Sequence, residues 1–214
     1  MTAEQRVAPP PTRSAVSRAE ILARVRANLP MRVPLPPLRV YERPPQAPLD
    51  AFAANLQRMG GELITIPDEA DLGDWIRRRY PDARVVCSAT FEVAGTRSVD
   101  SVHDPRELAD VDVGVVRAAL GVAETGSVLL SERHLKINAL AFLAQHLVVL
   151  LDPSSIVPDL HHAYRDPSFG DARYTLLLTG PSATADIEGV LVRGAQGARS
   201  LTVIARAPTR SVLV

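Results

Sequence analysis

Short apolar runs, separated by segments with helical spacing, constrain the fold of this chain more than any other feature. Runs rich in Val and Leu recur at residues 85–87, 113–116, 127–130, 147–151, 174–179 and 201–205. Most of these runs do not alternate apolar with polar residues, which is typical of strands buried on both faces. Helical patterns lie between several of them, at residues 105–111, 135–145, 153–164 and 183–192. The sequence therefore predicts an α/β fold with a mainly parallel sheet and helices on both faces. Residues 127–130 follow 113–116 too closely for a helical crossover, so an antiparallel pair is expected there.

The first 48 residues differ in composition from the rest, since ten of the 18 prolines occur by Pro48. We expect residues 1–13 to be a disordered tail and residues 34–45 to be a stiff, extended linker. Between them, residues 17–20 form a capping box that starts a helix ended by Pro30. The apolar stripe of this helix needs a partner, either the main domain or another chain. We therefore predict two parts: residues 1–48, with tail, helix and linker, and residues 49–214, an α/β domain.

The main domain is predicted to begin with a helix, a strand and a second helix. Leu49, Phe52, Leu56 and Met59 share one helical face, and Gly60 with Gly61 closes that helix. Residues 62–66 then read as a strand, and residues 68–80 as a helix.

Composition narrows the function classes. Lys plus Arg and Asp plus Glu both number 24, so no net charge draws the chain to nucleic acid. No apolar stretch reaches the roughly 18 residues needed to span a bilayer, and no secretory signal is visible, which predicts a cytoplasmic protein without membrane insertion. The single Cys87 excludes an iron–sulfur cluster held by this chain alone.

Residues 123–127 (Ala-Glu-Thr-Gly-Ser) form the first candidate ligand-binding turn, between two predicted strands. Gly126 would let backbone N–H groups approach a ligand closely, Thr125 and Ser127 add hydroxyls, and Glu124 adds a carboxylate. The alternative is a hairpin or crossover turn whose hydroxyls satisfy its own backbone.

Residues 180–188 (Gly-Pro-Ser-Ala-Thr-Ala-Asp-Ile-Glu) form the second candidate. After the strand at 174–179, Gly180 is expected to turn the chain into a helix whose free N–H groups favour an anion. Ser182, Thr184 and Asp186 would then face a ligand, or would merely cap the helix. If both turns lie at the carboxyl edge of the strands, they share one cavity.

The sequence does not predict a metal site, and three common nucleotide-binding or hydrolase motifs are missing from it. His161 and His162 are adjacent and would point about 100° apart on a helix, so no metal site is predicted. The sequence has no Walker A loop, no Gly-x-Gly-x-x-Gly fingerprint and no Gly-x-Ser-x-Gly elbow.

The two turns, together with residues 194–197 (Gly-Ala-Gln-Gly), resemble the LUD-domain family, in particular its lactate-utilisation protein C group. The resemblance covers roughly residue 49 to the C-terminus. It implies a fold like that of ribose-phosphate isomerase and the CoA transferases. The last motif usually reads Gly-x-His-Gly-Pro, whereas Gln196 and Ala198 stand here in place of the His and the Pro.

The resemblance implies a role in bacterial oxidation of L-lactate to pyruvate, beside iron–sulfur oxidoreductase subunits. We therefore expect an accessory subunit without iron–sulfur clusters that binds a small anionic or nucleotide-like ligand through the two turns. One alternative is a CoA-transferase-like or ligase-like enzyme that uses Glu124, because Glu124-Thr-Gly resembles the loop whose Glu attacks acyl-CoA in CoA transferases. Another alternative is a scaffold that docks partners through its N-terminal helix.

Overall fold

The computed structural model describes residues 13–31, 33–34, 36–37, 48–67, 69–185 and 189–208. The chain divides into two compact units, Met1–Leu38 and Arg39–Val214. In the first unit, α1 spans Arg13–Ala27. The predicted start of this helix at Ser17 is wrong, because the helical backbone begins four residues earlier and Ser17 lies inside it. The expected tail and most of the expected linker lie outside the described residues.

A six-stranded sheet forms the centre of the second unit, in the order β1-β12-β7-β4-β2-β3. All its pairings are parallel. The strands are β1 (Glu62–Thr65), β2 (Val86–Ser88), β3 (Arg97–Ser98), β4 (Val113–Arg117), β7 (His146–Leu151) and β12 (Ser200–Ala205). The mainly parallel α/β fold expected from the apolar runs is thus confirmed.

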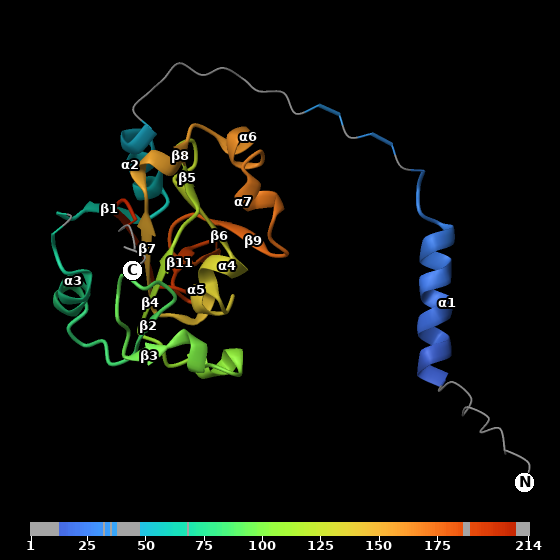
Figure 1. Ribbon diagram of the computed structural model, residues 1–214, viewed down its shortest axis with the longest axis horizontal. Helices are drawn as coiled ribbons and strands as arrows, with labels where there is room; N and C mark the ends of the chain where they lie inside the picture. Colours follow the sequence, from blue (N-terminus) through green and yellow to red (C-terminus); the bar gives the residue numbers. More distant parts are fainter. Residues whose placement is uncertain are drawn as a thin grey trace, which may run out of the picture. The chain divides into compact units, whose positions relative to one another are not determined.

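Both faces of this sheet are buried, because alternate residues of its strands join different cores. On β7, Val148 and Leu150 pack with one core, whereas Leu147, Val149 and Leu151 pack with the other. Helix α3 (Leu72–Arg79) covers the first face, and α2 (Pro48–Arg58) belongs to the second core. Figure 1 shows α3 on one side of the sheet and most of the remaining chain of this unit on the other.

A second sheet of four strands packs into the larger core, in the order β8-β5-β6-β9. Its strands are β5 (Leu120–Val122), β6 (Ser127–Ser131), β8 (Ile156–Val157) and β9 (Thr175–Leu178). β6 runs antiparallel to β5 and to β9, and not to β4. The short, antiparallel run expected at residues 127–130 therefore exists, within a separate sheet.

Three of the predicted helices are shorter or more broken than expected. Residues 105–111 contain the 3₁₀ turn η2 (Pro105–Leu108), and residues 135–145 hold the end of α4 (Glu132–Leu135) and all of α5 (Leu140–Leu143). Lys136 has φ 58°, which stops α4. The segment 153–164 splits into η3 (Pro153–Ser155), β8 and α6 (Leu160–Ala163), followed later by α7 (Pro167–Gly170). A further 3₁₀ turn, η1 (Val99–Ser101), follows β3.

The helix predicted at residues 183–192 is wrong. β10 (Ala183–Ala185) and β11 (Leu191–Arg193) form an antiparallel hairpin instead. Thr184, Val190 and Val192 are β-branched and favour extended backbone, and Gly189 has φ +75°. Because Gly180 leads into β10 and not into a helix, the expected attraction of an anion to a helix N-terminus does not apply there.

Candidate functional site

Hydroxyl groups join the first predicted turn to the residue that precedes the second one. Ser127, at the start of β6, is buried, and its Oγ lies 2.5 Å from Oγ1 of Thr179, just after β9. Thr125 Oγ1 lies 2.7 Å from the same Ser127 oxygen. The antiparallel pairing of Val128 with Leu178 positions these groups, because it aligns the start of β6 with the end of β9. This contact brings the first turn close to Thr179, the residue that precedes the second turn. A cavity shared by both turns stays a prediction.

The second turn is also fastened to the Gly-Ala-Gln-Gly segment. Ser182 N donates to Ala198 O at 2.9 Å, and Gly194 N donates to Ser182 O at 2.7 Å. Ala198 lies two residues before β12, so Ser182 sits beside the amino end of that parallel strand. The expected position at the carboxyl edge of the sheet is therefore wrong for this turn.

A pocket of about 240 Å³ lies where these segments meet. Its polar wall consists of Thr179, Ser182 and Gln196, and its apolar wall includes Phe142 and Leu178. All the residues that line it are uncharged; the remaining ones are Ala141, Gly180, Pro181, Gly197, Ala198 and Leu201. Gln196 and Ala198, which replace the usual His and Pro of the motif, thus both line the pocket. We call this cavity the motif pocket.

Gly180 is required by the shape of this turn. Its φ is +70°, and a Cβ added there would collide with the backbone carbonyl of Met59, at the end of α2. A larger residue would have to move the turn away from α2. The pocket wall is therefore in close backbone contact with Met59, the residue that follows α2.

The turn at residues 123–127 is held in the same way. Gly126 has φ +70°, and a Cβ there would collide with the backbone of Leu56 in α2. Asn55, also in α2, donates from Nδ2 to Ala123 O at 2.8 Å. These contacts give this turn a structural role, whatever it binds.

Glu124 faces away from the motif pocket and toward the start of α6. Its Oε2 accepts from Leu160 N at 3.3 Å, and its own N–H donates to Pro158 O at 3.0 Å. Asp159, the N-cap of α6, accepts from Nδ1 of His162 at 2.7 Å. Burial raises the pKa of Asp159, but the hydrogen bonds from His162 outweigh it and leave this pKa below its ordinary value. Glu124 thus helps to cap a helix, and its role as an acyl acceptor stays a prediction.

Thr184 and Asp186 complete the predicted set. Thr184 lies in β10, opposite Val192, and outside the lining of the motif pocket. Asp186 lies outside the described residues. Ligand binding by the predicted residues stays a prediction, and of those that the structure describes only Gly180 and Ser182 line the motif pocket.

No local sequence pattern predicts the buried charge pair at the carboxyl edge of the central sheet. Arg117, the last residue of β4, donates from Nε and Nη2 to the two carboxylate oxygens of Glu92, both at 2.6 Å. The Glu92 side chain is only 3% exposed. Thr90 Oγ1 also donates to Glu92, at 3.1 Å. These residues follow or end strands far apart in the sequence, so only the sheet order brings them together.

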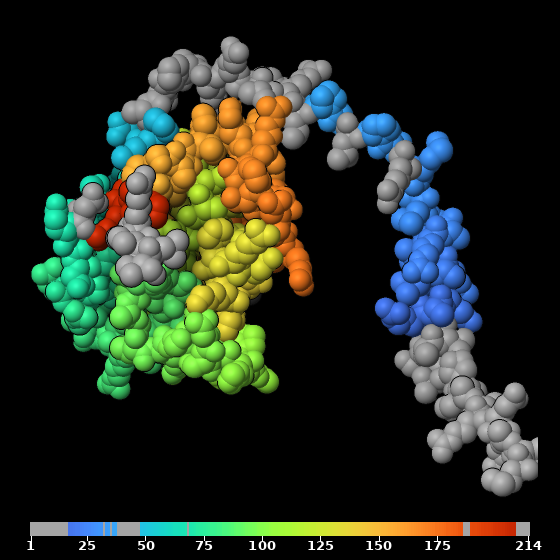
Figure 2. Space-filling model, viewed as in Figure 1, coloured from blue at the N-terminus to red at the C-terminus, as the bar shows by residue number. Residues whose placement is uncertain are grey.

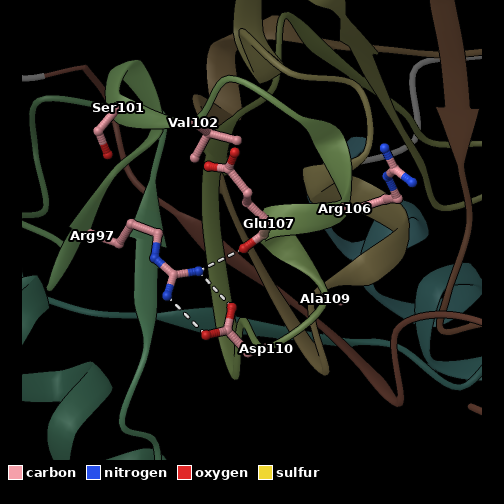
Figure 3. A pocket seen from close by; sticks show the side chains of 7 residues that line it. All are labelled: Arg97, Ser101, Val102, Arg106, Glu107, Ala109 and Asp110. Carbon is pink, nitrogen blue, oxygen red and sulfur yellow. Dashed lines mark hydrogen bonds and ion pairs between the residues drawn. The ribbon is translucent and has the colours of Figure 1, made fainter.

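A hollow of about 420 Å³ beside β3 is lined by Arg97, Arg106, Glu107 and Asp110 (Figure 3). Arg97 forms a two-point ion pair with Asp110 and donates to Glu107 O at 2.7 Å. Because these hydrogen bonds tie β3 to η2 and the segment after it, the arginine has a structural use.

Two further findings concern the described residues. They contain no group of three or more His, Cys, Asp or Glu side chains able to hold a metal ion. In the same part of the chain, no helix combines the length and the apolar character needed to cross a membrane.

Comparison with known proteins identifies related sequences. The family model of the LUD domain matches residues 98–205. An uncharacterized protein of Neisseria meningitidis serogroup B is 25% identical, over 75% of this chain and 67% of the relative. Two proteins named lactate utilization protein C are also similar. The one from Geobacillus kaustophilus is 24% identical over 69% of this chain and 63% of its own length. The one from Geobacillus sp. strain WCH70 is 27% identical over 68% of this chain and 62% of its own length. The chain thus spans slightly less than two thirds of the two Geobacillus relatives.

Among solved structures, a DUF162 family protein from Deinococcus radiodurans has the same fold. Its TM-score is 0.57 at 18% identity, and the match covers 76% of this chain and 99% of that protein.

Proposed function

This chain belongs to the LUD domain family, and we propose from that premise that it takes part in lactate utilization. Its role would be that of a subunit without iron–sulfur clusters, in a bacterial system that oxidises L-lactate to pyruvate. The names of the two Geobacillus relatives support the process. The single cysteine, Cys87, is buried in the sheet, which supports a role that leaves electron transfer to partner subunits.

The motif pocket is the observation that carries the proposal of a ligand. Its volume of about 240 Å³ is below the roughly 300 Å³ of the smallest usual cofactor sites, so it favours a small molecule. Hydroxyls of Thr179 and Ser182 and the amide of Gln196 offer hydrogen bonds to a carboxylate or a hydroxyl. The rings and branches of Phe142 and Leu178 offer an apolar wall for a methyl group. A small hydroxy acid or oxo acid fits this chemistry.

A complementation experiment tests this function. The encoding frame is deleted in its organism, and growth on L-lactate as sole carbon source is measured with the wild-type chain, Ser182→Leu or Thr184→Leu supplied in trans. Ser182→Leu should fill the motif pocket and abolish growth on lactate. Thr184→Leu changes the same residue class two positions away, outside the pocket, and should support growth. Undiminished growth of the deletion strain on lactate would refute the role in lactate utilization.

A second experiment addresses the partners. Affinity purification of the full chain should recover iron-containing subunits, detected by their metal content and visible absorption. Removal of residues 1–38, the first compact unit, tells whether α1 carries this docking. Recovery of the chain without any iron protein would contradict the proposed assembly.

A further inference from the structure

The direction in which the chain adds strands to the central sheet reverses between β2 and β4, which are neighbours in the sheet. From β2 the chain continues to β3 on one side, whereas from β4 it eventually continues to β7 on the other side. In open parallel sheets, ligands bind beyond the carboxyl ends of the strands where such a reversal occurs. The carboxyl ends of β2 and β4 are therefore the place to look for a second site.

A cleft of about 310 Å³ lies at this edge. Its walls are Phe91 and Glu92, which follow β2, Arg206, which follows β12, and residues 70–72 at the start of α3. In Figure 2 the end of the described chain, in red, lies at the surface beside the teal segment that contains β1 and α3. We call this cavity the edge cleft. It lies at the other end of β12 from the motif pocket, roughly 17 Å away from Leu201 to Arg206 at about 3.3 Å per residue of strand.

The charged groups of the edge cleft are held in fixed positions. Arg206 donates from Nη1 to Ala70 O at 2.9 Å. Arg117 holds Glu92 and also donates to Arg206 O at 3.2 Å, which links the ends of β4 and β12. The cleft therefore presents a fixed guanidinium on one side.

Asp71 supplies a carboxylate to the same cleft. Its Oδ1 accepts from Asp74 N at 2.8 Å as the N-cap of α3. This hydrogen bond is the main cause that lowers the pKa of Asp71, and Arg206 adds to the effect. The carboxylate is thus charged at neutral pH and can accept hydrogen bonds from ligand hydroxyls.

Phe91 is the unusual residue of the edge cleft. It is 74% exposed and lies three residues after β2. An aromatic face at the mouth of a cleft can stack on a planar ring. Phe91 packs in neither of the two cores beside the central sheet, so core packing does not explain the presence of an aromatic residue here.

We propose that the edge cleft binds a mononucleotide. Phe91 would stack on the base, Asp71 would accept hydrogen bonds from the ribose hydroxyls, and Arg206 would contact the phosphate. Glu92 and Arg117 would keep the cleft open by fixing its floor. This site is separate from the motif pocket and does not depend on the function proposed for it.

Titration calorimetry on the full chain, with AMP, adenosine and inorganic phosphate as probes, tests this site. AMP should bind more tightly than adenosine, and phosphate more weakly than either. Phe91→Ala should weaken AMP and adenosine binding at least about fivefold, because stacking on an aromatic side chain is lost. Asp71→Asn retains a helix-capping side chain and should also weaken both.

Phe142→Ala is the matched control, since it removes an exposed ring from the motif pocket and should leave AMP binding unchanged. Absence of saturable AMP binding at concentrations up to about 1 mM would overturn the proposal. Equal AMP affinity of Phe91→Ala and the wild type would overturn it as well, as would phosphate binding as tight as that of AMP.

Discussion

Breaking the Glu92–Arg117 pair should destabilise the domain far more than breaking a surface pair. The Glu92 and Arg117 side chains are 3% and 18% exposed, and two hydrogen bonds of 2.6 Å join them. Arg117→Met leaves a carboxylate inside the protein without its cation. Loss of one partner of a buried pair costs about 3–5 kcal/mol, a large part of the 5–15 kcal/mol that stabilises a typical domain.

The double variant Glu92→Leu/Arg117→Met should recover much of this loss. Two apolar side chains need no solvation, so their burial offsets the removed attraction. We expect the unfolding free energy of the double variant to exceed that of either single variant by at least about 1 kcal/mol. The loss in Arg117→Met should also shrink at low pH, because the unpaired Glu92 can take up a proton.

Urea unfolding followed by circular dichroism measures these free energies, with unchanged slopes as the sign of a common unfolded state. Arg106→Met is the control, since Arg106 is 90% exposed in its pair with Asp104 and should cost less than about 1 kcal/mol. A loss below 1 kcal/mol for Arg117→Met would refute the reasoning. Additivity of the two single losses in the double variant would refute it too.

Three further predictions concern turns, pH and the motif pocket. Gly126→Ala should lower the unfolding free energy, measured by thermal unfolding, by more than about 2 kcal/mol, because it adds a backbone collision to a positive φ. Gly189→Ala should lower it by about 1 kcal/mol, because only the positive φ is unfavourable there. Gly170→Ala should change it very little, because a Cβ at this position meets no atom within 4 Å. Similar losses for all three would contradict this explanation. Burial lowers the pKa of His134 and of His146, and the nearby Arg199 and Arg79 lower the pKa of His146 further. The unfolded chain therefore binds more protons than the folded one, so the unfolding free energy should fall as pH drops below about 6.5. This fall should be smaller in the double variant His134→Gln/His146→Gln. A flat profile between pH 7.5 and 5 would contradict it. Gln196→His places a titratable ring on the motif pocket, so ligand affinity should become pH-dependent near pH 6.5; an unchanged pH profile would show that residue 196 does not face the ligand.

The strands of the central sheet could be predicted because burial on both faces leaves a direct mark on the sequence. Residues 147–151 and 201–205 are continuous apolar runs, and both became inner strands of the parallel sheet. The hairpin at β10 and β11 could not be predicted in the same way. Its residues are largely exposed, so they carry no burial pattern, and Asp and Glu near a Gly-Pro turn resemble a helix start.

The candidate site was predicted in part. The hydroxyl and glycine content of the two turns marked them as candidates, but their relative position could not be read from the sequence; the contact between Ser127 and Thr179 shows that the first turn lies beside the start of the second. The direction of Glu124 could not be predicted, because the chain that it caps, at Leu160, lies 36 residues further on. Glu92, Arg117 and Arg206 were missed for the same reason: each is unremarkable in its local sequence, and the sheet order alone gathers them.

The most direct test of the central claim is a calorimetric titration of the full chain with L-lactate and pyruvate, beside Ser182→Leu and Thr184→Leu. The motif pocket should give saturable binding of at least one acid to the wild type and to Thr184→Leu, and none to Ser182→Leu. Equal binding by all three chains, or by none, would contradict a ligand site between Thr179, Ser182 and Gln196.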